Sequence, residues 1–366
     1  MAEDSQTFKL LFLSTPVGPL GSGLGGGVEL TLINLCHELQ KRGHQLAVVA
    51  PAGSTLGEIP IIEIPGEWQP TAHTQGRQTP VTMPGNAVLA NMCEYARQVQ
   101  ADYDLIINFA YDWLPFYLTP FFQSVPLAHF VSMGSLSEAM DAVIGQVADQ
   151  FPERIGVYTQ TQANTFPFPQ YCRVLGSAID LNLYDYCDEP GPWTVWMGRI
   201  SPEKGLEDAV AAAQISRIPL KILGKLEDAT YWQKILDTYP EAPIEYLGFL
   251  PTKALQAVVR ECRALIMTPR WVEAFGNVAI EALACGVPII SYARGGPTEI
   301  IQAGKTGWLV QPDSVEDLVY ALNRLDELDR RACRQQAEAE YSLAALGDRF
   351  EQWFSELLCY SCRQVD

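Results

Sequence analysis

The sequence predicts an α/β protein with two domains, each a doubly wound parallel sheet covered by helices. Short apolar runs alternate along the chain with segments whose apolar residues recur at helical spacing, an order typical of parallel sheets. A polar, turn-rich segment at 181–192 interrupts this alternation, which then starts again. With 366 residues, the chain is also long enough for two domains with separate cores.

The first domain is expected to span residues 1–185. It begins with a buried strand at 9–13, a glycine-rich loop and a helix at 28–42 that Gly43 ends. Further strands are expected at 45–49, 59–64, 104–108, 127–131 and 154–159, and further helices at 86–100, 112–119 and 141–149.

The second domain is expected to span residues 186–344 and to repeat the same alternation. Its strands are expected at 193–197, 220–223, 244–247, 264–267, 287–291 and 308–310, and its helices at 206–216, 229–239, 253–260, 277–284, 314–327 and 329–340. The closing segment 345–366 contains an amphipathic stretch, which we expect to pack back onto the first domain.

Composition narrows the classes of partner. The net charge of −18 disfavours nucleic acid and anionic membranes. No apolar run approaches the roughly 18–20 residues of a membrane-spanning helix, so we expect a cytoplasmic protein without stable membrane association. Nine scattered cysteines predict reduced thiols, and the single pair Cys359 and Cys362 gives little support for a metal or redox site. The four histidines lack metal-ligand spacing, so no metal is expected.

The loop after the first strand is rich in glycine, and Gly21, Gly23 and Gly26 fit the pattern G-x-G-x-x-G. An NAD-linked oxidoreductase is nevertheless disfavoured. The loop is too long before Gly21, and the second strand ends without the acidic residue that would bind a ribose. We expect instead that backbone N–H groups of 25–27 hold a phosphate at the start of the helix. A flexible turn without a ligand is the alternative.

Two cations flank a Ser-Pro turn directly after the strand that opens the second domain. Arg199 and Lys204 belong to the segment GRISPEKG at 198–205. Ligands bind at the carboxyl ends of strands in open α/β sheets. An arginine fork can hold two phosphate oxygens and a lysine adds a mobile positive charge, so the segment predicts a pyrophosphate site.

Two carboxylates lie around the start of a predicted helix at 277–284. Glu273 is in the preceding loop and Glu281 is in the helix, which Asn277 is expected to cap. A helix N-terminus offers N–H groups to a phosphate, and carboxylates accept hydrogen bonds from sugar hydroxyls, so the pattern predicts a nucleotide-sugar site. A glycoside hydrolase also uses paired acids, but the separate Arg/Lys phosphate site disfavours it.

These motifs, in this order, resemble the retaining GT-B glycosyltransferases of family four. The resemblance implies two Rossmann-like domains that face each other across a cleft, with the closing helix crossing back to the first domain. It also implies metal-independent, retaining transfer of a hexosyl group from a UDP-sugar, with no cofactor. The matching segments are the GGG loop and helix at 25–42, RGHQLAVVAP at 42–51, GRISPEKG at 198–205, YLGFLP at 246–251, the glutamate pair, GVPII, and GGPTEIIQAGKTGWLV at 295–310.

The resemblance implies roles for the residues on the donor side. Arg199 and Lys204 would bind the diphosphate and, with Glu273 beside the donor sugar, form the catalytic set. Glu281 would bind the ribose hydroxyls. The other donor-binding positions would be Gly26, Gly27, Gly248, Phe249, Leu250, Phe275, Gly276, Asn277 and Val278. No enzyme nucleophile is implied, because fixed hydrogen-bond donors and cations stabilise the leaving diphosphate.

The acceptor side departs from the family pattern. Many relatives carry a histidine in an HAHDW-like segment and another after the next strand. This chain has Tyr111, followed by Asp112, at the first place and Ser132 at the second. His129 lies three residues earlier than the second family histidine. These four residues are the candidate acceptor-binding positions.

The amino-terminal segment is similar to cyanobacterial members of the family that transfer glucose from UDP-glucose to tetrahydrobiopterin, which implies a small soluble acceptor. A lipid or polysaccharide intermediate is one alternative. It is disfavoured because residues 1–190 contain only 7 Lys and Arg against 19 Asp and Glu, too few cations for a basic membrane-docking helix. A nucleotide-sugar-binding protein without transfer activity is the other alternative, since the family histidines are replaced.

Overall fold

The computed structural model describes residues 7–70 and 76–363. The chain forms two compact units. The first contains the chain up to Ser177 and again from Leu343 onward, and the second contains Ala178–Ser342. The segment from Leu343 onward therefore returns to the first unit, as expected for 345–366.

The boundary between the units lies before the expected one at 185/186. The reason is that residues just after Ser177 pair with the end of the second unit. The N–H of Ile179 donates to the carbonyl of Tyr341 at 3.0 Å, and Ile179 forms a parallel bridge with Ser342. These long-range contacts leave no pattern in the local sequence.

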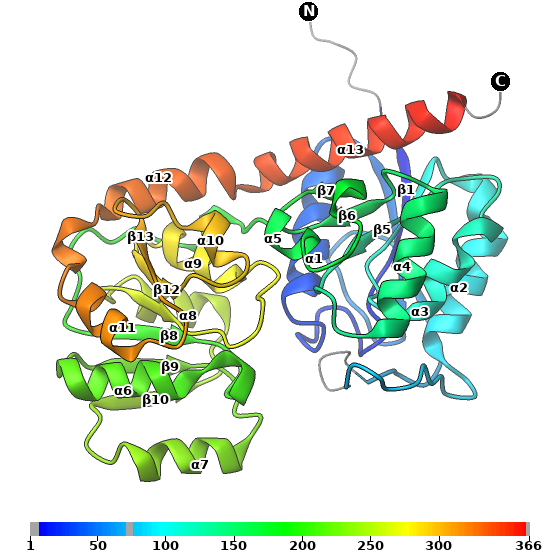
Figure 1. Ribbon diagram of the computed structural model, residues 1–366. Helices are drawn as coiled ribbons and strands as arrows, with labels where there is room; N and C mark the ends of the chain where they lie inside the picture. The colour runs from blue at the N-terminus through cyan, green and yellow to red at the C-terminus, as the bar shows by residue number, and fades with distance from the viewer. Residues whose placement is uncertain (1–6, 71–75, 364–366) are drawn as a thin grey trace, which may run out of the picture. The chain divides into compact units, whose positions relative to one another are not determined.

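The first unit is built on a seven-stranded sheet in which all neighbouring strands are parallel (Figure 1). The strand order is β3-β2-β1-β4-β5-β6-β7. The strands are β1 (Lys9–Leu13), β2 (Gln45–Pro51), β3 (Ile61–Ile64), β4 (Leu105–Asn108), β5 (Leu127–Val131), β6 (Ile155–Val157) and β7 (Cys172–Val174). The sequence predicts all of them except β7, which is too short and too exposed to show an apolar run.

Helices cover both faces of this sheet. One layer contains α2 (Val88–Val99), α3 (Trp113–Leu118) and α4 (Glu138–Gln150), whose apolar residues share clusters with alternate strand residues. The other contains α1 (Gly27–Lys41) and α13 (Leu343–Arg363), which pack together. The short helices are η2 (Gln100–Asp102), η3 (Thr119–Phe121), α5 (Gln160–Ala163) and η4 (Pro169–Tyr171).

Helix α13 is anchored to the first unit by packing and by ion pairs. Phe350 and Trp353 are fully buried, and the Phe350 ring lies 5.6 Å from the ring of Phe130 in β5. The guanidinium of Arg42 at the end of α1 binds Glu351 at 2.5 Å. The amphipathic pattern predicts this helix correctly but not its full length.

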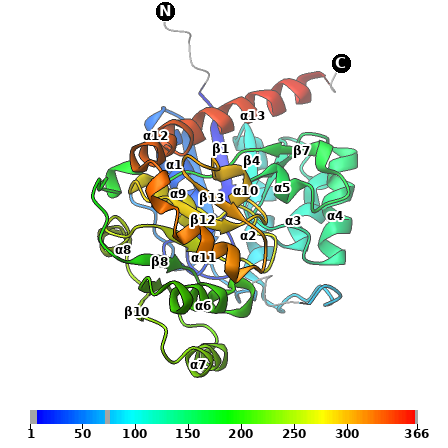
Figure 2. The same cartoon turned by 60° about the vertical axis from the view of Figure 1, so that its left-hand side comes forward.

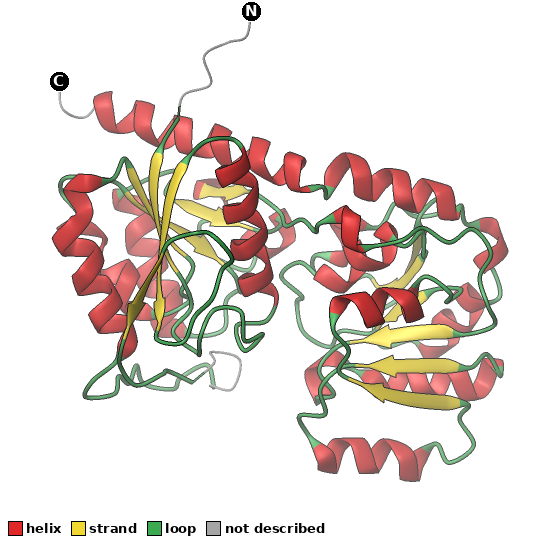
Figure 3. Ribbon diagram, turned by 180° about the vertical axis from the view of Figure 1, so that it is seen from behind, coloured by secondary structure: helices red, strands yellow, loops and turns green. Residues whose placement is uncertain are grey.

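The second unit contains a six-stranded parallel sheet of order β10-β9-β8-β11-β12-β13, visible from behind in Figure 3. Its strands are β8 (Thr194–Met197), β9 (Leu220–Leu223), β10 (Ile244–Gly248), β11 (Leu265–Met267), β12 (Ile289–Tyr292) and β13 (Gly307–Val310). The sequence predicts each of these strands.

Two helix layers also cover the second sheet. On one face α6 (Leu206–Ser216) packs against α11 (Val315–Leu322), and on the other α9 (Asn277–Ala284) packs against α12 (Arg330–Glu340). Figure 2 shows α9 and α11 beside β12 and β13. The remaining helices are η5 (Leu181–Leu183), η6 (Pro202–Lys204), α7 (Ala229–Thr238), α8 (Thr252–Val259), α10 (Pro297–Ile300) and η7 (Leu325–Glu327). The predicted helix at 314–327 is in fact two elements, α11 and η7.

Each sheet has one point where the direction of the strand order reverses. In the first unit this switch lies between β1 and β4, and in the second between β8 and β11. The loops that leave the carboxyl ends of two such strands diverge to opposite faces, so a crevice forms between them. The two switch points are therefore where each unit is expected to bind a ligand.

Candidate functional site

Lys204 and Glu273 meet at the switch point of the second sheet. Lys204 ends η6 after β8, and Glu273 lies in the loop between β11 and α9. Lys204 Nζ is 2.5 Å from Glu273 Oε2, and the indole N–H of Trp271 donates to the same oxygen at 3.0 Å. The lysine also lies over the Trp271 ring, 4.8 Å from its centroid. The structure thus brings two of the three predicted catalytic residues into direct contact.

Two glycines allow the loops around this pair to approach closely. Gly205 has φ +64°, and a Cβ there would lie 2.1 Å from the carbonyl oxygen of Thr268. Gly295 has φ +74°, and a Cβ there would lie 2.4 Å from the carbonyl oxygen of Glu273. Only glycine meets both demands, because L-residues with a Cβ are strained at positive φ and would collide with backbone here.

The Glu273 carboxylate remains charged at neutral pH. Burial raises its pKa, but the adjacent Lys204 ammonium and the Trp271 N–H more than offset that effect, and the net shift of the pKa is downward. Glu273 therefore orients Lys204 as a fixed anion.

Arg199 is also paired with carboxylates. Its guanidinium lies 3.1 Å from Glu203 Oε1 and 2.7 Å from Glu227 Oε2. Both predicted phosphate-binding cations are thus held by acidic neighbours from the same unit. A diphosphate would have to share or replace these partners, a competition that sequence reasoning did not anticipate.

Glu281 has a partner that the sequence does not reveal. It lies in α9, and the hydroxyl of Tyr184 donates to its Oε1 at 2.8 Å. Burial raises the pKa of Glu281 to about 7, although the Tyr184 hydrogen bond lowers it. Tyr184 lies in the turn-rich segment between the predicted domains, with no motif around it.

Helix α9 starts differently from the prediction. Gly276, with φ +99°, precedes the helix, and Asn277 is its first residue rather than its cap. The left-handed conformation at Gly276 turns the chain directly into the helix, so no side-chain cap is used. Phe275 is buried and meets the Tyr341 ring edge-on, with centroids 6.0 Å apart. Phe275 and Gly276 thus precede the helix and Asn277 and Val278 are its first two residues, so the predicted cap at Asn277 is wrong.

The end of β10 carries the residues predicted to border the nucleobase. The N–H of Gly224 donates to the Gly248 carbonyl at 2.8 Å, so that carbonyl already has one partner. The next side chain, Phe249, is 73% exposed, the most exposed of the large apolar side chains in the described chain. Its ring offers a flat apolar surface at the carboxyl end of the sheet, directly before Leu250.

The glycine-rich loop of the first unit holds a carboxylate of its own. Glu29 in the first turn of α1 accepts hydrogen bonds from the N–H groups of Gly21 at 2.6 Å, Gly23 at 3.0 Å and Gly25 at 2.9 Å. The N–H of Gly26 donates to the carbonyl of Gly23. The expectation that Gly25 gives its N–H to a ligand phosphate is therefore wrong for this structure, because an internal anion takes that group.

Sequence reasoning passed over Glu29. An acid in the first turn of a helix that follows a glycine-rich loop was the available signal, since a helix N-terminus and a run of loop N–H groups attract negative charge. Gly26, with φ +63°, directly precedes α1, and Gly27 is its first residue.

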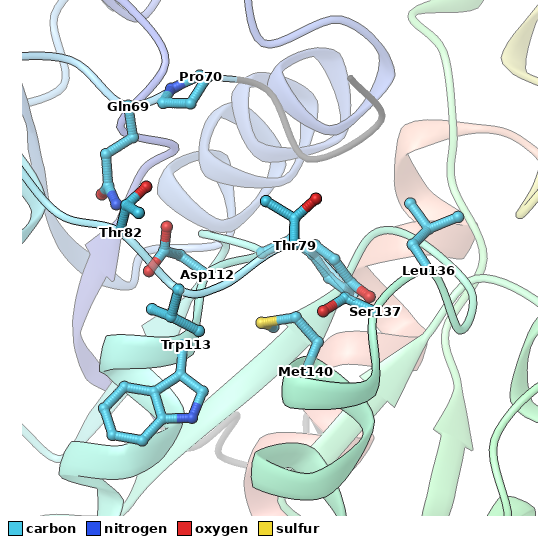
Figure 4. A pocket seen from close by; sticks show the side chains of 11 residues that line it. Gln69, Pro70, Thr79, Thr82, Asp112, Trp113, Leu136, Ser137 and Met140 are labelled. Atoms are coloured by element: carbon cyan, nitrogen blue, oxygen red, sulfur yellow. The ribbon is translucent and has the colours of Figure 1, made fainter. Parts of the chain in front are cut away.

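A pocket of about 50 Å³ lies in the first unit, at the carboxyl ends of β4 and β5 (Figure 4). Tyr111 and Asp112 come from the loop after β4, and Ser137 and Met140 from the segment after β5. The residues that line the pocket are Gln69, Pro70, Thr79, Val81, Thr82, Tyr111, Asp112, Trp113, Leu136, Ser137 and Met140.

Two predicted acceptor-side residues belong to this pocket. Asp112 precedes α3 and accepts from the N–H of Leu114 at 3.4 Å, and burial raises the pKa of its carboxyl to about 6. The Tyr111 hydroxyl donates to the carbonyl of Gly134 at 3.0 Å, and burial raises its pKa. The phenol therefore stays neutral at physiological pH.

The other two acceptor-side candidates, His129 and Ser132, do not line the pocket. His129 is fully buried in β5, where its ring nitrogens contact Asn108 Nδ2 at 3.2 Å and Thr119 Oγ1 at 2.9 Å. Burial lowers its pKa to about 3, so the ring is neutral. The structure places His129 in the core rather than at the surface of the pocket. Ser132 follows β5 and is partly exposed outside the pocket.

Parts of the sequence are similar to those of known glycosyltransferases. Residues 188–341 match the family described as Glycosyl transferases group 1. The sulfoquinovosyl transferase SQD2 of Arabidopsis thaliana is 27% identical over 184 residues, 48% of this chain and 36% of that protein. The D-inositol 3-phosphate glycosyltransferase of Rhodococcus erythropolis is 34% identical over 164 residues, 41% of this chain and 37% of that protein. The matched part of this chain thus spans less than half the length of each of these relatives.

Solved structures resemble the chain over almost its whole length. The Anabaena protein HepE in complex with UDP and glucose aligns with a TM-score of 0.74 and 19% identity, covering 95% of this chain and 99% of that chain. The sucrose-phosphate synthase of Thermosynechococcus elongatus aligns with a TM-score of 0.73 and 17% identity, covering 97% and 100%. The fold is that of the GT-B glycosyltransferases, and most of its second unit matches the glycosyltransferase group 1 family model. In the described part of the chain, no helix is both long and apolar enough to cross a membrane.

Proposed function

We propose that this protein is a retaining glycosyltransferase that moves glucose from UDP-glucose to a small acceptor, with tetrahydrobiopterin as the candidate acceptor. The observation that carries the proposal is the contact between Lys204 and Glu273 at the switch point of the second sheet, directly before the N-terminus of α9. This placement, within the segment that matches the glycosyltransferase family, suits a nucleotide sugar. HepE, which shares the fold, binds UDP and glucose.

In the proposed complex, different residues bind different parts of the UDP-glucose donor. Arg199 and Lys204 hold the diphosphate, and the charged Glu273 fixes the position of the lysine. Glu281 accepts hydrogen bonds from the ribose hydroxyls, and the exposed ring of Phe249 stacks on the base. The positive charge that a metal ion supplies in other transferases comes here from the two side chains, so we propose that transfer needs no metal and no cofactor.

The chemical step breaks the bond between the glucose anomeric carbon and the diphosphate oxygen and forms a bond to the acceptor on the same face. Arg199 and Lys204 stabilise the negative charge that develops on the leaving oxygen. The acceptor proton passes to that diphosphate oxygen. No protein nucleophile takes part, in keeping with the burial and neutrality of His129.

The proposal is tested with purified protein, UDP-glucose and a panel of acceptors that includes tetrahydrobiopterin, following UDP release and product mass. Lys204→Ala is expected to lower turnover by at least about tenfold, roughly 1.4 kcal/mol of transition-state stabilisation. Glu281→Ala should weaken donor binding. The exposed Lys234 on α7 offers the control Lys234→Ala, which should behave as wild type. Normal kinetics for both Lys204→Ala and Glu281→Ala would exclude this site.

Two alternatives have different outcomes in the same assay. A lipid or polysaccharide acceptor is favoured by one feature, an exposed aromatic row in which Tyr117 stacks on Trp113 at 4.5 Å and lies 6.1 Å from Phe121. Transfer only to such acceptors would support it. A nucleotide-sugar-binding protein without transfer activity would show thermal stabilisation by UDP-glucose but no product with any acceptor.

A further inference from the structure

Gln69 is a buried polar residue that the donor chemistry does not use. Its side chain lines the pocket of the first unit, and only 6% of the residue is exposed. Its Oε1 atom is shielded from solvent and has no hydrogen-bond partner among the described residues. A buried carbonyl oxygen without a donor is unfavourable, and native proteins retain few such atoms. The atom is therefore a candidate contact for a ligand.

The orientation of the Gln69 amide follows from its neighbour. Gln69 hydrogen-bonds the side chain of Asp112, and a charged carboxylate can only accept, so the amide Nε2 faces Asp112 (Figure 4). The Oε1 atom is then turned away from the carboxylate. Both side chains line the pocket, and each carries an acceptor oxygen.

The rest of the pocket limits the chemistry of a ligand further. Apolar groups from Trp113, Leu136 and Met140 contribute to its wall. Asp112 is the charged residue among the described residues that line it, and the nearby Arg77 is paired with Glu138 and Asp141. A phosphate or carboxylate would be repelled by the Asp112 carboxylate, and the described lining offers no cation to offset that repulsion.

We propose that this pocket selects an acceptor that presents two adjacent N–H or O–H donors, one to Gln69 Oε1 and one to Asp112, and rejects acceptors that carry an anionic group there. The proposal rests on the proposed transferase function and names the acceptor class. An amino group beside a ring N–H meets the requirement, and so does a pair of neighbouring sugar hydroxyls. Gln69 is thus a specificity-determining residue.

The first experiment measures acceptor kinetics for wild type, Gln69→Leu and Asp112→Asn. Leucine has a similar size and removes the oxygen, so KM for the acceptor should rise at least about tenfold, since a site built to hydrogen-bond a donor discriminates strongly. The KM for UDP-glucose and the slow hydrolysis of UDP-glucose in water should not change. Gln98→Leu, on the exposed surface of α2, is the matched control and should leave all constants unchanged.

The second experiment compares three acceptor types: tetrahydrobiopterin for the amino and N–H edge, methyl glucoside for the diol, and inositol phosphate for the anionic class. The first two distinguish the source of the donor pair, and the third should be used at least about tenfold less well than the better of them. An unchanged acceptor KM in Gln69→Leu, or preferred use of inositol phosphate, overturns the proposal while leaving the transferase function in place.

Acceptor-induced thermal stabilisation separates this proposal from the function itself. If no acceptor is glucosylated by wild type, the proposed function fails. Stabilisation of wild type by a donor-pair compound, lost in Gln69→Leu, would still support the pocket, and equal stabilisation of both proteins would overturn it. If Gln69→Leu fails to fold, Asp112→Asn, which keeps the side-chain shape, is measured instead. Its acceptor KM should also rise, and an unchanged KM would overturn the proposal.

Discussion

Glu281, the proposed ribose-binding residue, has a pKa near neutrality. Burial raises the pKa of its carboxyl to about 7, so the group is partly protonated at physiological pH. Ribose hydroxyls donate hydrogen bonds, which the charged carboxylate accepts best. The charged form is populated above the pKa, so donor affinity should increase as the pH rises through that value.

The expected result is that KM for UDP-glucose falls as the pH rises from about 6 to about 8. Glu281→Gln should give a higher KM that does not change over this range, because its side chain does not titrate. Tyr184→Phe removes the hydrogen bond that lowers the pKa of Glu281, so its profile should move to higher pH. Steady-state kinetics at several pH values measure all three, and identical profiles would contradict the assignment.

Arg199 provides a second test at the level of single residues. Glu227 lies 2.7 Å from its guanidinium, with both side chains partly exposed, and would compete with a diphosphate bound as proposed. Because exposed ion pairs are weak, Glu227→Gln should lower KM for UDP-glucose by only roughly two- to fivefold. The matched control is Glu241→Gln, since Glu241 forms a distant exposed pair with Arg217. A higher KM in Glu227→Gln would show that Glu227 assists binding instead.

At the scale of elements, the turn after β8 is held by the close approach of Gly205 to the loop after β11. A Cβ at this position would lie 2.1 Å from the Thr268 carbonyl oxygen. Gly205→Ala should therefore displace Lys204 and lower both turnover and stability, the latter by more than about 2 kcal/mol.

Gly43 is the appropriate control for this prediction. It also has positive φ, +92°, but a Cβ there would have no neighbour within 4 Å. Gly43→Ala should cost only about 1 kcal/mol and leave turnover unchanged. Chemical denaturation and steady-state kinetics of both variants separate backbone strain from steric collision. Equal losses in the two proteins would show that the collision at Gly205 is relieved at no cost.

At the scale of the whole molecule, the last helix, α13, belongs to the first unit although it follows the second unit in sequence. Trp353 of α13 is fully buried there, and its indole N–H donates to the carbonyl of Glu153 at 2.8 Å. Trp353→Ala should lower the free energy of unfolding of the first unit by about 3–5 kcal/mol, because it leaves a large cavity and an unpaired carbonyl. Gln352→Ala, at an exposed neighbouring position, should have little effect.

Denaturation followed by hydrogen exchange assigns this loss to a unit. Amides of β5 and β6 should exchange faster in Trp353→Ala, while those of β8 and β11 should keep their protection. Faster exchange confined to β8 and β11 would contradict the placement of α13.

The sequence by itself determined nearly all strands of the two sheets and the candidate residues of the proposed donor site. Alternating apolar runs locate every strand except β7, since buried parallel strands leave a local pattern that a three-residue edge strand lacks. Short spacings around 198–205 and 273–281 also predict that these candidate residues lie at the ends of strands, whereas the ion pair between Lys204 and Glu273 is known only from the structure.

Only the tertiary structure decided which polar side chains already have hydrogen-bond partners within the protein. Tyr184 and Glu281 are 97 residues apart, and their hydrogen bond has no local record in the sequence. The same holds for the burial of His129 and for the Gln69 oxygen, which has no hydrogen-bond partner within 7–70 and 76–363. Periodicity and motif spacing report which face of an element is buried, whereas hydrogen-bond partners and pKa shifts depend on distant segments that folding brings together.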